Sequence, residues 1–204
     1  LSVQDFILTV DNKYTIKSAD HSANVLIRDY VIPASYKYIA RPKTEKLTSL
    51  IAKIPDWTQY SLLDGPAHIF MNNEFKGTAM ILTNALTDTL ELLIGSDKEI
   101  KISREKVFDK SNKQFMVSSQ KETRTWEVTV WNNKNTEVEV AIEDQYPLSN
   151  NADIEVKLLN SGSAVVNPTN GALMWNLKLL PHEVKRLSFS YHVKYPLGDK
   201  VLVE

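Results

Sequence analysis

Cysteine is absent from the 204-residue chain, which excludes disulfides, thiolate catalysis and cysteine-based zinc sites without fixing the compartment. Only six glycines occur, and none forms a phosphate-binding loop. No apolar run approaches the roughly 18–20 residues of a membrane-spanning helix, so we expect a soluble chain. An excess of basic charge is also missing, with 24 Lys and Arg against 25 Asp and Glu. Nucleic-acid binding is therefore not expected.

The motifs of catalysis and metal binding are missing as well. The four histidines have no metal-ligand spacing, and they are His21, His68, His182 and His192. No nucleophile elbow of the G-x-S-x-G type and no calcium-loop pattern is present. We therefore expect no metal and no cofactor. The chain starts at Leu1 without a basic or apolar leader, which favours a piece of a longer protein whose targeting signal has been removed.

Alternation of apolar and polar residues with a period of two is the dominant pattern. In the second half it covers residues 125–130, 137–143, 154–158, 173–179 and 186–194, and it is typical of strands with one buried and one wet face. Weaker strands at 114–118 and 164–166 bring the count to about seven, as in an immunoglobulin-like sandwich. In the first half we predict strands at 6–10, 23–32, 36–41, 47–54, 67–71, 75–81, 89–94 and 99–107. Residues 44–56 also fit a helix, although Thr48, Ser49 and Pro55 favour a strand.

These patterns predict an all-β chain of two antiparallel, sandwich-type domains. The first, residues 1–113, is strand-rich, and the second, residues 114–204, is immunoglobulin-like. The linker is placed within residues 108–120, where a polar stretch lacks periodicity. The cations Lys98, Lys101, Arg104 and Lys106 alternate with acids, as on a solvated strand.

Two groups of residues are candidates for a site. Four aromatic residues fall at strand ends or opposite the predicted core, where they could stack on a sugar or anchor a partner: Trp57, Tyr60, Trp131 and Tyr146. The alternative is that they close the ends of the sandwich. Three carboxylates at loop edges could serve glycoside hydrolysis, namely Asp64, Asp97 and Asp144. The alternative for these is turn chemistry, as in Asp64-Gly65-Pro66.

A series of short motifs runs in order along nearly the whole chain. They are Val31-Ile32-Pro33, Tyr38-Ile39-Ala40-Arg41-Pro42, Leu62-Leu63-Asp64-Gly65-Pro66-Ala67, residues 69–77, residues 94–100, residues 104–107, Val130-Trp131-Asn132-Asn133, Asp144-Gln145-Tyr146-Pro147 within residues 143–149, and Tyr191-His192-Val193-Lys194-Tyr195-Pro196. With these motifs the chain resembles the C-terminal domain of the mucoidy inhibitor A-like family, a bacterial domain of unknown function. His182 stands where that family usually has glycine.

The resemblance implies a bacterial source, an upstream coiled coil that would allow oligomerisation, and export to the periplasm or beyond. It supplies no catalytic residues. We therefore expect a non-enzymatic structural or interaction module of an envelope protein, with an envelope protein or a polysaccharide as partner. A carbohydrate-binding module and a polysaccharide-processing hydrolase are the alternatives. The loops that contain Asp64 and Gly65, and Asp144, Gln145 and Pro147, are expected to fix the packing between the domains.

Overall fold

The computed structural model describes residues 10, 13–15, 25–71, 73–82, 88–116 and 118–198. Thirteen strands and two short 3-10 helices, η1 (Trp57–Tyr60) and η2 (Phe108–Lys110), form all of its regular structure. The all-β prediction is therefore confirmed for this part of the chain. The strands are β1 (Ser35–Ala40), β2 (Thr48–Pro55), β3 (Gly65–Met71), β4 (Glu74–Ile81), β5 (Thr89–Asp97), β6 (Ile100–Lys106), β7 (Asn112–Phe115), β8 (Ser119–Asn132), β9 (Val138–Gln145), β10 (Glu155–Asn160), β11 (Val165–Asn167), β12 (Ala172–Leu179) and β13 (Val184–Pro196).

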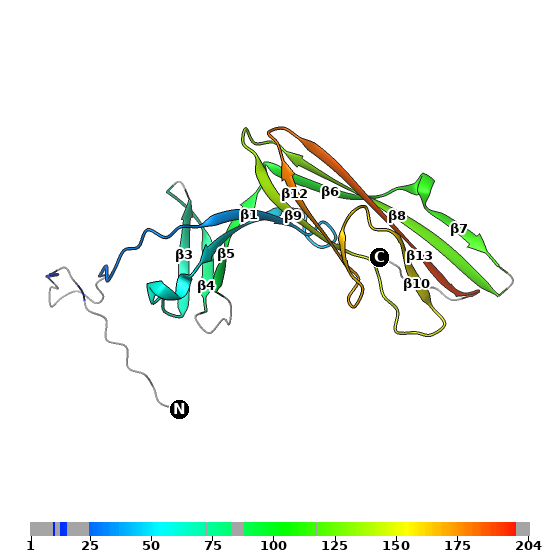
Figure 1. The fold of residues 1–204 in the computed structure, drawn as a ribbon, viewed down its shortest axis with the longest axis horizontal. Coiled ribbons are helices and arrows are strands. Elements are labelled where there is room, and N and C mark those ends of the chain that lie inside the picture. Colours follow the sequence, from blue (N-terminus) through cyan, green and yellow to red (C-terminus); the bar gives the residue numbers. More distant parts are fainter. Residues whose placement is uncertain are drawn as a thin grey trace, which may run out of the picture.

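The strands form three sheets (Figure 1). Sheet A has the order β11-β12-β9-β1-β2-β5, and sheet C has the order β10-β13-β8-β6, with β7 also paired to β8. The hairpin β3–β4 forms a sheet of its own. Neither 3-10 helix is long or apolar enough to span a membrane, and the described residues contain no other helix.

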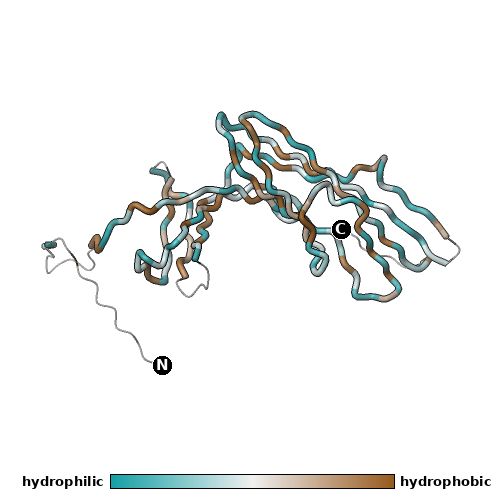
Figure 2. The backbone as a smooth tube through the Cα atoms, viewed as in Figure 1, coloured by the Kyte–Doolittle hydropathy of each residue, from teal (hydrophilic) through white to brown (hydrophobic). Residues whose placement is uncertain are grey.

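Sheets A and C bury a common core. Val140, Ile142 and Trp175 from sheet A belong to the same buried cluster as Val128 and Phe189 from sheet C. The alternating hydropathy of the strands in Figure 2 gives each sheet one apolar face, and burying two such faces together removes both from water. The period-two pattern of the second half thus predicts which side chains are buried.

Both large sheets run across the predicted boundary after residue 113. In sheet C, β6 pairs with β8 from Ile100↔Asn132 to Lys106↔Trp126. In sheet A, β1 pairs with β9 through Tyr38↔Val140 and two further pairs. This second pairing is parallel, whereas only antiparallel strands were predicted. The two predicted segments therefore share two hydrogen-bonded sheets.

Four local expectations meet different outcomes. Residues 44–56 contain strand β2, which confirms the strand that the sequence favoured over a helix. The strand predicted at residues 23–32 is wrong for residues 25–32, which pair with no strand, and Val31 is 98% exposed there. The strand predicted at residues 6–10 lies outside the described residues except for Val10. Arg104 is not on a solvated face, because its side chain is only 9% exposed.

Candidate functional site

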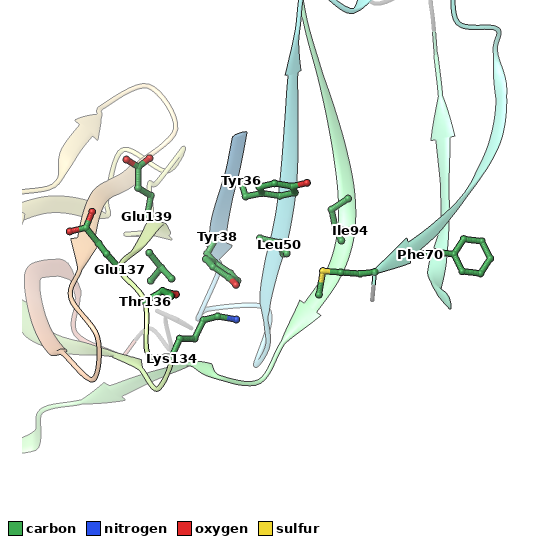
Figure 3. Close-up of a pocket in the computed structure, with 11 residues that line it drawn as sticks. Tyr36, Tyr38, Leu50, Phe70, Ile94, Lys134, Thr136, Glu137 and Glu139 are labelled. Carbon is green, nitrogen blue, oxygen red and sulfur yellow. The ribbon is translucent and has the colours of Figure 1, made fainter. Parts of the chain in front are cut away.

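A hollow of about 420 Å³ opens on sheet A where β1 and β9 diverge. We call it the β1–β9 hollow. Its wall comes from β1, β2, β5, the approach to β9 and the end of β3 (Figure 3). The lining residues are Tyr36, Tyr38, Leu50, Phe70, Met71, Ile94, Lys134, Thr136, Glu137, Val138 and Glu139.

The strand pairing explains why a hollow forms here. Strands β1 and β9 are neighbours only from Tyr38↔Val140 to Ala40↔Ile142, so residues 35–37 of β1 pair with β2 alone. Tyr36 and Tyr38 project from the same face of β1 because side chains alternate along a strand. Tyr38 is buried in the wall, whereas Tyr36 is 61% exposed at the lip.

A hydrogen-bonded cluster closes the inner end of the hollow. The hydroxyl of Tyr38 and the ammonium of Lys134 both donate to Oδ2 of Asp97, each over 2.7 Å. Lys134 also donates to Oε2 of Glu99 over 3.2 Å, and the backbone N–H of Glu99 donates to Oδ1 of Asp97 over 2.9 Å. The cluster therefore ties β1 and β5 to the loop that precedes β9.

The pKa shifts in this cluster keep both Asp97 and Lys134 charged. Burial opposes the charge of Lys134, but the hydrogen bonds to Asp97, Tyr38 and Glu99 outweigh burial and raise the Lys134 pKa. Burial likewise opposes the Asp97 carboxylate, and the hydrogen bonds from Lys134, Tyr38 and Glu99 outweigh it, so the Asp97 pKa is lowered. Burial and the bond to Asp97 raise the pKa of the Tyr38 phenol. A lysine nucleophile is activated by a lowered pKa, and a carboxyl group that acts as a general acid needs a raised one. The pKa values of Lys134 and Asp97 are shifted in the opposite directions.

Two glutamates lie at the outer edge of the hollow, and in Figure 3 their carboxylates point away from Tyr36 and Tyr38. Glu137 is exposed and has no ion-pair partner among the described residues. Glu139 lies 3.4 Å from Lys178, in a pair whose two side chains are both mostly exposed. Such an exposed pair contributes little to stability.

The β3–β4 hairpin adds aromatic surface beside the hollow. Phe70 and Phe75 are 65% and 53% exposed, and their rings make an edge-to-face contact with centroids 5.5 Å apart. In Figure 3 the ring of Phe70 points away from Tyr36 and Tyr38, so it extends the apolar surface outward. The hairpin therefore presents aromatic side chains to solvent.

The four aromatic residues singled out by the sequence lie in different environments. Trp57 and Tyr146 are buried, so they do not offer a ring to a sugar. Tyr60 is half-buried and makes an edge-to-face contact with Tyr30, at 5.4 Å between centroids. Trp131 is half-buried on β8, where the ammonium of Lys101 lies 5.5 Å from its ring centroid.

The three predicted carboxylates are also in different surroundings. Asp64 is exposed just before β3. Asp97 belongs to the cluster of Tyr38 and Lys134. Asp144 has no exposed side-chain surface and accepts a hydrogen bond from Nε of Arg104 over 2.8 Å, inside the sandwich. The described residues hold no group of three or more His, Asp or Glu side chains suited to a metal ion.

Gln145 and Tyr146 of the family motifs fix the backbone at a corner of sheet A. Nε2 of Gln145 donates to the carbonyl of Asn170 over 2.6 Å, and the N–H of Tyr146 donates to the carbonyl of Gly171 over 3.1 Å. Pro147 follows the end of β9 and is half-buried. Gly65 begins β3. The contacts of Gln145 and Tyr146 lie within sheet A and its loops and organise the turn that leads into β12, whereas Gly65 lies in the hairpin sheet.

Sequence reasoning missed most of the lining of the hollow. Tyr36 and Glu137 lie in none of the family motifs, and the divergence of β1 from β9 depends on a pairing between distant segments. One signal was available at the hairpin. Ile69, Phe70 and Met71 are three consecutive apolar residues in a strand, so at least one of them must face outward.

The fold and the hollow together define an all-β domain with a two-sheet core and an exposed apolar hairpin. The chain belongs to the family described as a domain of unknown function, DUF4139, whose profile matches residues 4–197. It is also similar to protein F37C4.5 of Caenorhabditis elegans, with 24% identity over 206 residues. That match covers 93% of this chain and 36% of the nematode protein, so the chain spans about a third of that relative.

Proposed function

We propose that the chain is a non-catalytic interaction module that binds a partner protein at the β1–β9 hollow and the adjoining hairpin. The observation that carries the proposal is the exposure of Tyr36 at the hollow and of Phe70 and Phe75 on the adjoining hairpin. Aromatic residues dominate the energetic centres of protein interfaces because they bury much area at little entropic cost.

Exposing this much apolar surface to water costs free energy in a domain that has no partner. Beyond the three rings, Met80 on β4 and Leu93 on β5 are exposed as well. Figure 2 shows hydrophobic stretches in this same part of the fold. Folded monomers rarely expose contiguous apolar patches beyond a few hundred Å², and larger ones mark interaction sites.

The cellular setting is a separate part of the proposal. The resemblance to the mucoidy inhibitor A-like family supports a bacterial envelope protein, located in the periplasm or secreted. The count of about seven strands supports an immunoglobulin-like arrangement of residues 114–204. The nematode relative carries a similar region outside bacteria, so the binding role is argued from the surface and not from the compartment.

Carbohydrate binding ranks second because burial removes two of its four aromatic candidates. Tyr60 and Trp131 keep partial exposure. The hydrolase alternative is weaker, because the Asp97 carboxylate is engaged by Lys134 and Asp144 is enclosed with Arg104. Neither arrangement presents a pair of carboxylates to a cleft, as glycoside hydrolysis requires.

The proposal is tested by co-purification from the native host, using tagged wild-type protein and a Phe70→Ser/Phe75→Ser variant. A Leu159→Ser/Val165→Ser variant is the matched control, because both side chains are exposed on β10 and β11. We expect a defined set of proteins to be lost from the hairpin variant and retained by the control. Identical sets from all three proteins would contradict the proposal.

A further inference from the structure

We propose that residues 25–32, which we call the β1 arm, add as a strand to the outer edge of β3 in a second copy of this chain, so that two copies exchange arms in a dimer. The contact uses a strand edge and not the β1–β9 hollow. It therefore goes beyond the proposed function and does not depend on it.

The β1 arm has the composition of a strand but no strand beside it. Its sequence, Val-Leu-Ile-Arg-Asp-Tyr-Val-Ile, is rich in β-branched and large apolar residues, which favour strands. Leu26 is exposed and Val31 is almost completely so. Ile27, Val31 and Ile32 make no hydrogen bond within the part of the chain that the structure describes. Apolar side chains and backbone groups of the arm are thus both open to a neighbouring strand.

The arm leaves the sheets where it joins β1. In Figure 1 it is drawn in blue and runs from the start of β1 away from sheets A and C. The ring of Tyr30 makes an edge-to-face contact with Tyr60 of η1, and the carbonyl of Leu26 accepts a hydrogen bond from the hydroxyl of Tyr14 over 3.3 Å. Neither contact involves a β-sheet, so the arm is placed to meet the sheet of another molecule.

The outer edge of β3 is the matching acceptor. β3 pairs with β4 from Gly65↔Ile81 to Met71↔Glu74, and these two strands are the whole of their sheet. Within the described residues, no backbone group of β3 bonds to any other segment. Alternate residues of an antiparallel strand direct their N–H and C=O groups to opposite edges, so part of the β3 backbone points to an edge without a neighbour. Such an edge is a template for a strand of another chain.

The side chains of the arm suit those of β3. Ile69 and Phe70 are adjacent on β3 and lie on opposite faces of the hairpin sheet, as Val31 and Ile32 would in an added strand. Pairing therefore places β-branched residues beside aliphatic and aromatic ones, and such cross-strand pairs stabilise sheets. A hairpin of two strands is marginal by itself, and a third strand adds most to a sheet of this size.

A second copy fits this edge because one chain supplies both halves of the contact. β3 contains no Lys, Arg, Asp or Glu, and the arm contains one residue of each sign, Arg28 and Asp29. Two copies therefore bring no like charges together along the shared edge. A two-fold axis would pair two arms with two edges in one self-complementary interface.

The first test is sedimentation equilibrium of the 204-residue chain over a range of concentrations, where we expect a monomer–dimer equilibrium. Leu26→Pro/Val31→Pro removes two N–H groups that point to opposite edges of the arm, since the positions are an odd number of residues apart. One donor is thus lost whichever edge pairs with β3. The variant should weaken the dimer by about tenfold or more.

Leu26→Thr/Val31→Thr is the matched control, because threonine keeps the N–H group and favours strands. It should weaken the dimer by no more than about threefold. Both side chains are exposed in the single chain, so we expect unchanged circular dichroism from both variants at concentrations where the chain is monomeric. A wild type that stays monomeric, or a proline variant that dimerises as the wild type does, would overturn the proposal.

Disulfide cross-linking identifies the edge, because the chain has no cysteine of its own. A Val31→Cys protein is mixed under oxidising conditions with proteins in which residues 67–70 of β3 are replaced by cysteine in turn. We expect a mixed disulfide at one or more of these positions. Val165→Cys, at an exposed position on β11, is the reference. Mixed disulfides with β3 no more abundant than with position 165 would contradict the proposed edge.

The best cross-linking position is then combined with Val31→Cys in one chain, which separates exchange between copies from pairing within a chain. Oxidation should give a covalent dimer. A covalently closed monomer would show that the arm pairs with β3 of its own chain, and would overturn the second copy as the occupant. The partner-binding role of the hollow is unaffected by either result, because it is measured with Tyr36, Phe70 and Phe75.

Discussion

Arg104 on β6 and Asp144 on β9 form an ion pair that joins the two sheets through their common interior. Nε of Arg104 lies 2.8 Å from Oδ2 of Asp144, and the Asp144 side chain has no exposed surface. The Arg104 guanidinium also lies 3.6 Å from the ring centroid of Trp126. The second Asp144 oxygen accepts the backbone N–H of Gln145 over 2.7 Å. The pair fixes the position of sheet A relative to sheet C.

Breaking this pair should destabilise the fold strongly. Asp144→Ala leaves a buried guanidinium without its anion, which costs about 3–5 kcal/mol of unfolding free energy. The double variant Arg104→Met/Asp144→Leu removes both charges and should recover most of that loss. Urea unfolding of the three proteins measures the difference. A double variant as unstable as Asp144→Ala alone would show that the charge is not the cause.

The Tyr38–Asp97–Lys134 cluster should make stability depend on pH in the acid range. Because the folded state lowers the Asp97 pKa, its stabilisation is present above the unfolded value of about 3.9 and is lost as pH falls through the lower folded value. Asp97→Asn should cost about 1–3 kcal/mol near neutral pH and flatten this dependence. Unfolding free energies from pH 7 to about pH 2 measure it, and an unchanged slope in the variant would contradict the assignment.

His192 on β13 should add a second pH dependence nearer to neutrality. Burial, with Lys121 next, lowers its pKa, although Glu155 opposes the shift, and its Nδ1 is buried without a partner in the described structure. The unfolded chain then binds the proton more readily. Stability should therefore fall as pH drops below about 6.5.

His192→Gln should remove this loss of stability, whereas Thr123→Val should keep it. Thr123 is the cross-strand neighbour of His192 on β8 and does not titrate. Thermal unfolding midpoints between pH 8 and pH 5 compare the variants. The same decline in His192→Gln as in the wild type would refute the role given to His192.

Gly171 should tolerate no side chain. Its φ is +74°, and a Cβ there would lie 2.4 Å from the carbonyl oxygen of Tyr146. Gly171→Ala should therefore cost at least about 1–3 kcal/mol. Gly171→Asn separates backbone strain from the clash of the Cβ, because asparagine accepts the left-handed backbone but still carries a Cβ. We expect both variants to be similarly unstable in chemical denaturation, and a stable Asn variant would show that only backbone strain matters.

Residues 114–204 should not fold as an independent domain. Without the first half, β8 loses β6 and β9 loses β1, so the buried Val128 and Val140 would lie on open sheet edges. We expect this segment to aggregate or to show poor dispersion of its amide resonances. A well-dispersed, cooperatively unfolding segment would instead support the division after residue 113.

The strands of the second half could be predicted because their burial follows the period of the chain. The same rule predicts that Arg104 is buried. Arg104 follows Ile100 and Ile102 at intervals of two, which places it on the buried face of β6. Pairing between distant segments, as in Tyr38↔Val140, leaves no local trace, so the hollow was not predictable. The strand predicted around Val31 is wrong because composition does not show whether a neighbouring strand exists.

The claim that the β1–β9 hollow is a partner-binding site is tested most directly by photo-crosslinking in the native host, with a photoreactive phenylalanine analogue in place of Tyr36. The same analogue at Val165, an exposed position on β11, is the reference. The account predicts discrete adducts from position 36 that are lost when Phe70→Ser/Phe75→Ser is added, and none of the same adducts from position 165. Identical adducts from both positions, or none from position 36, would contradict it.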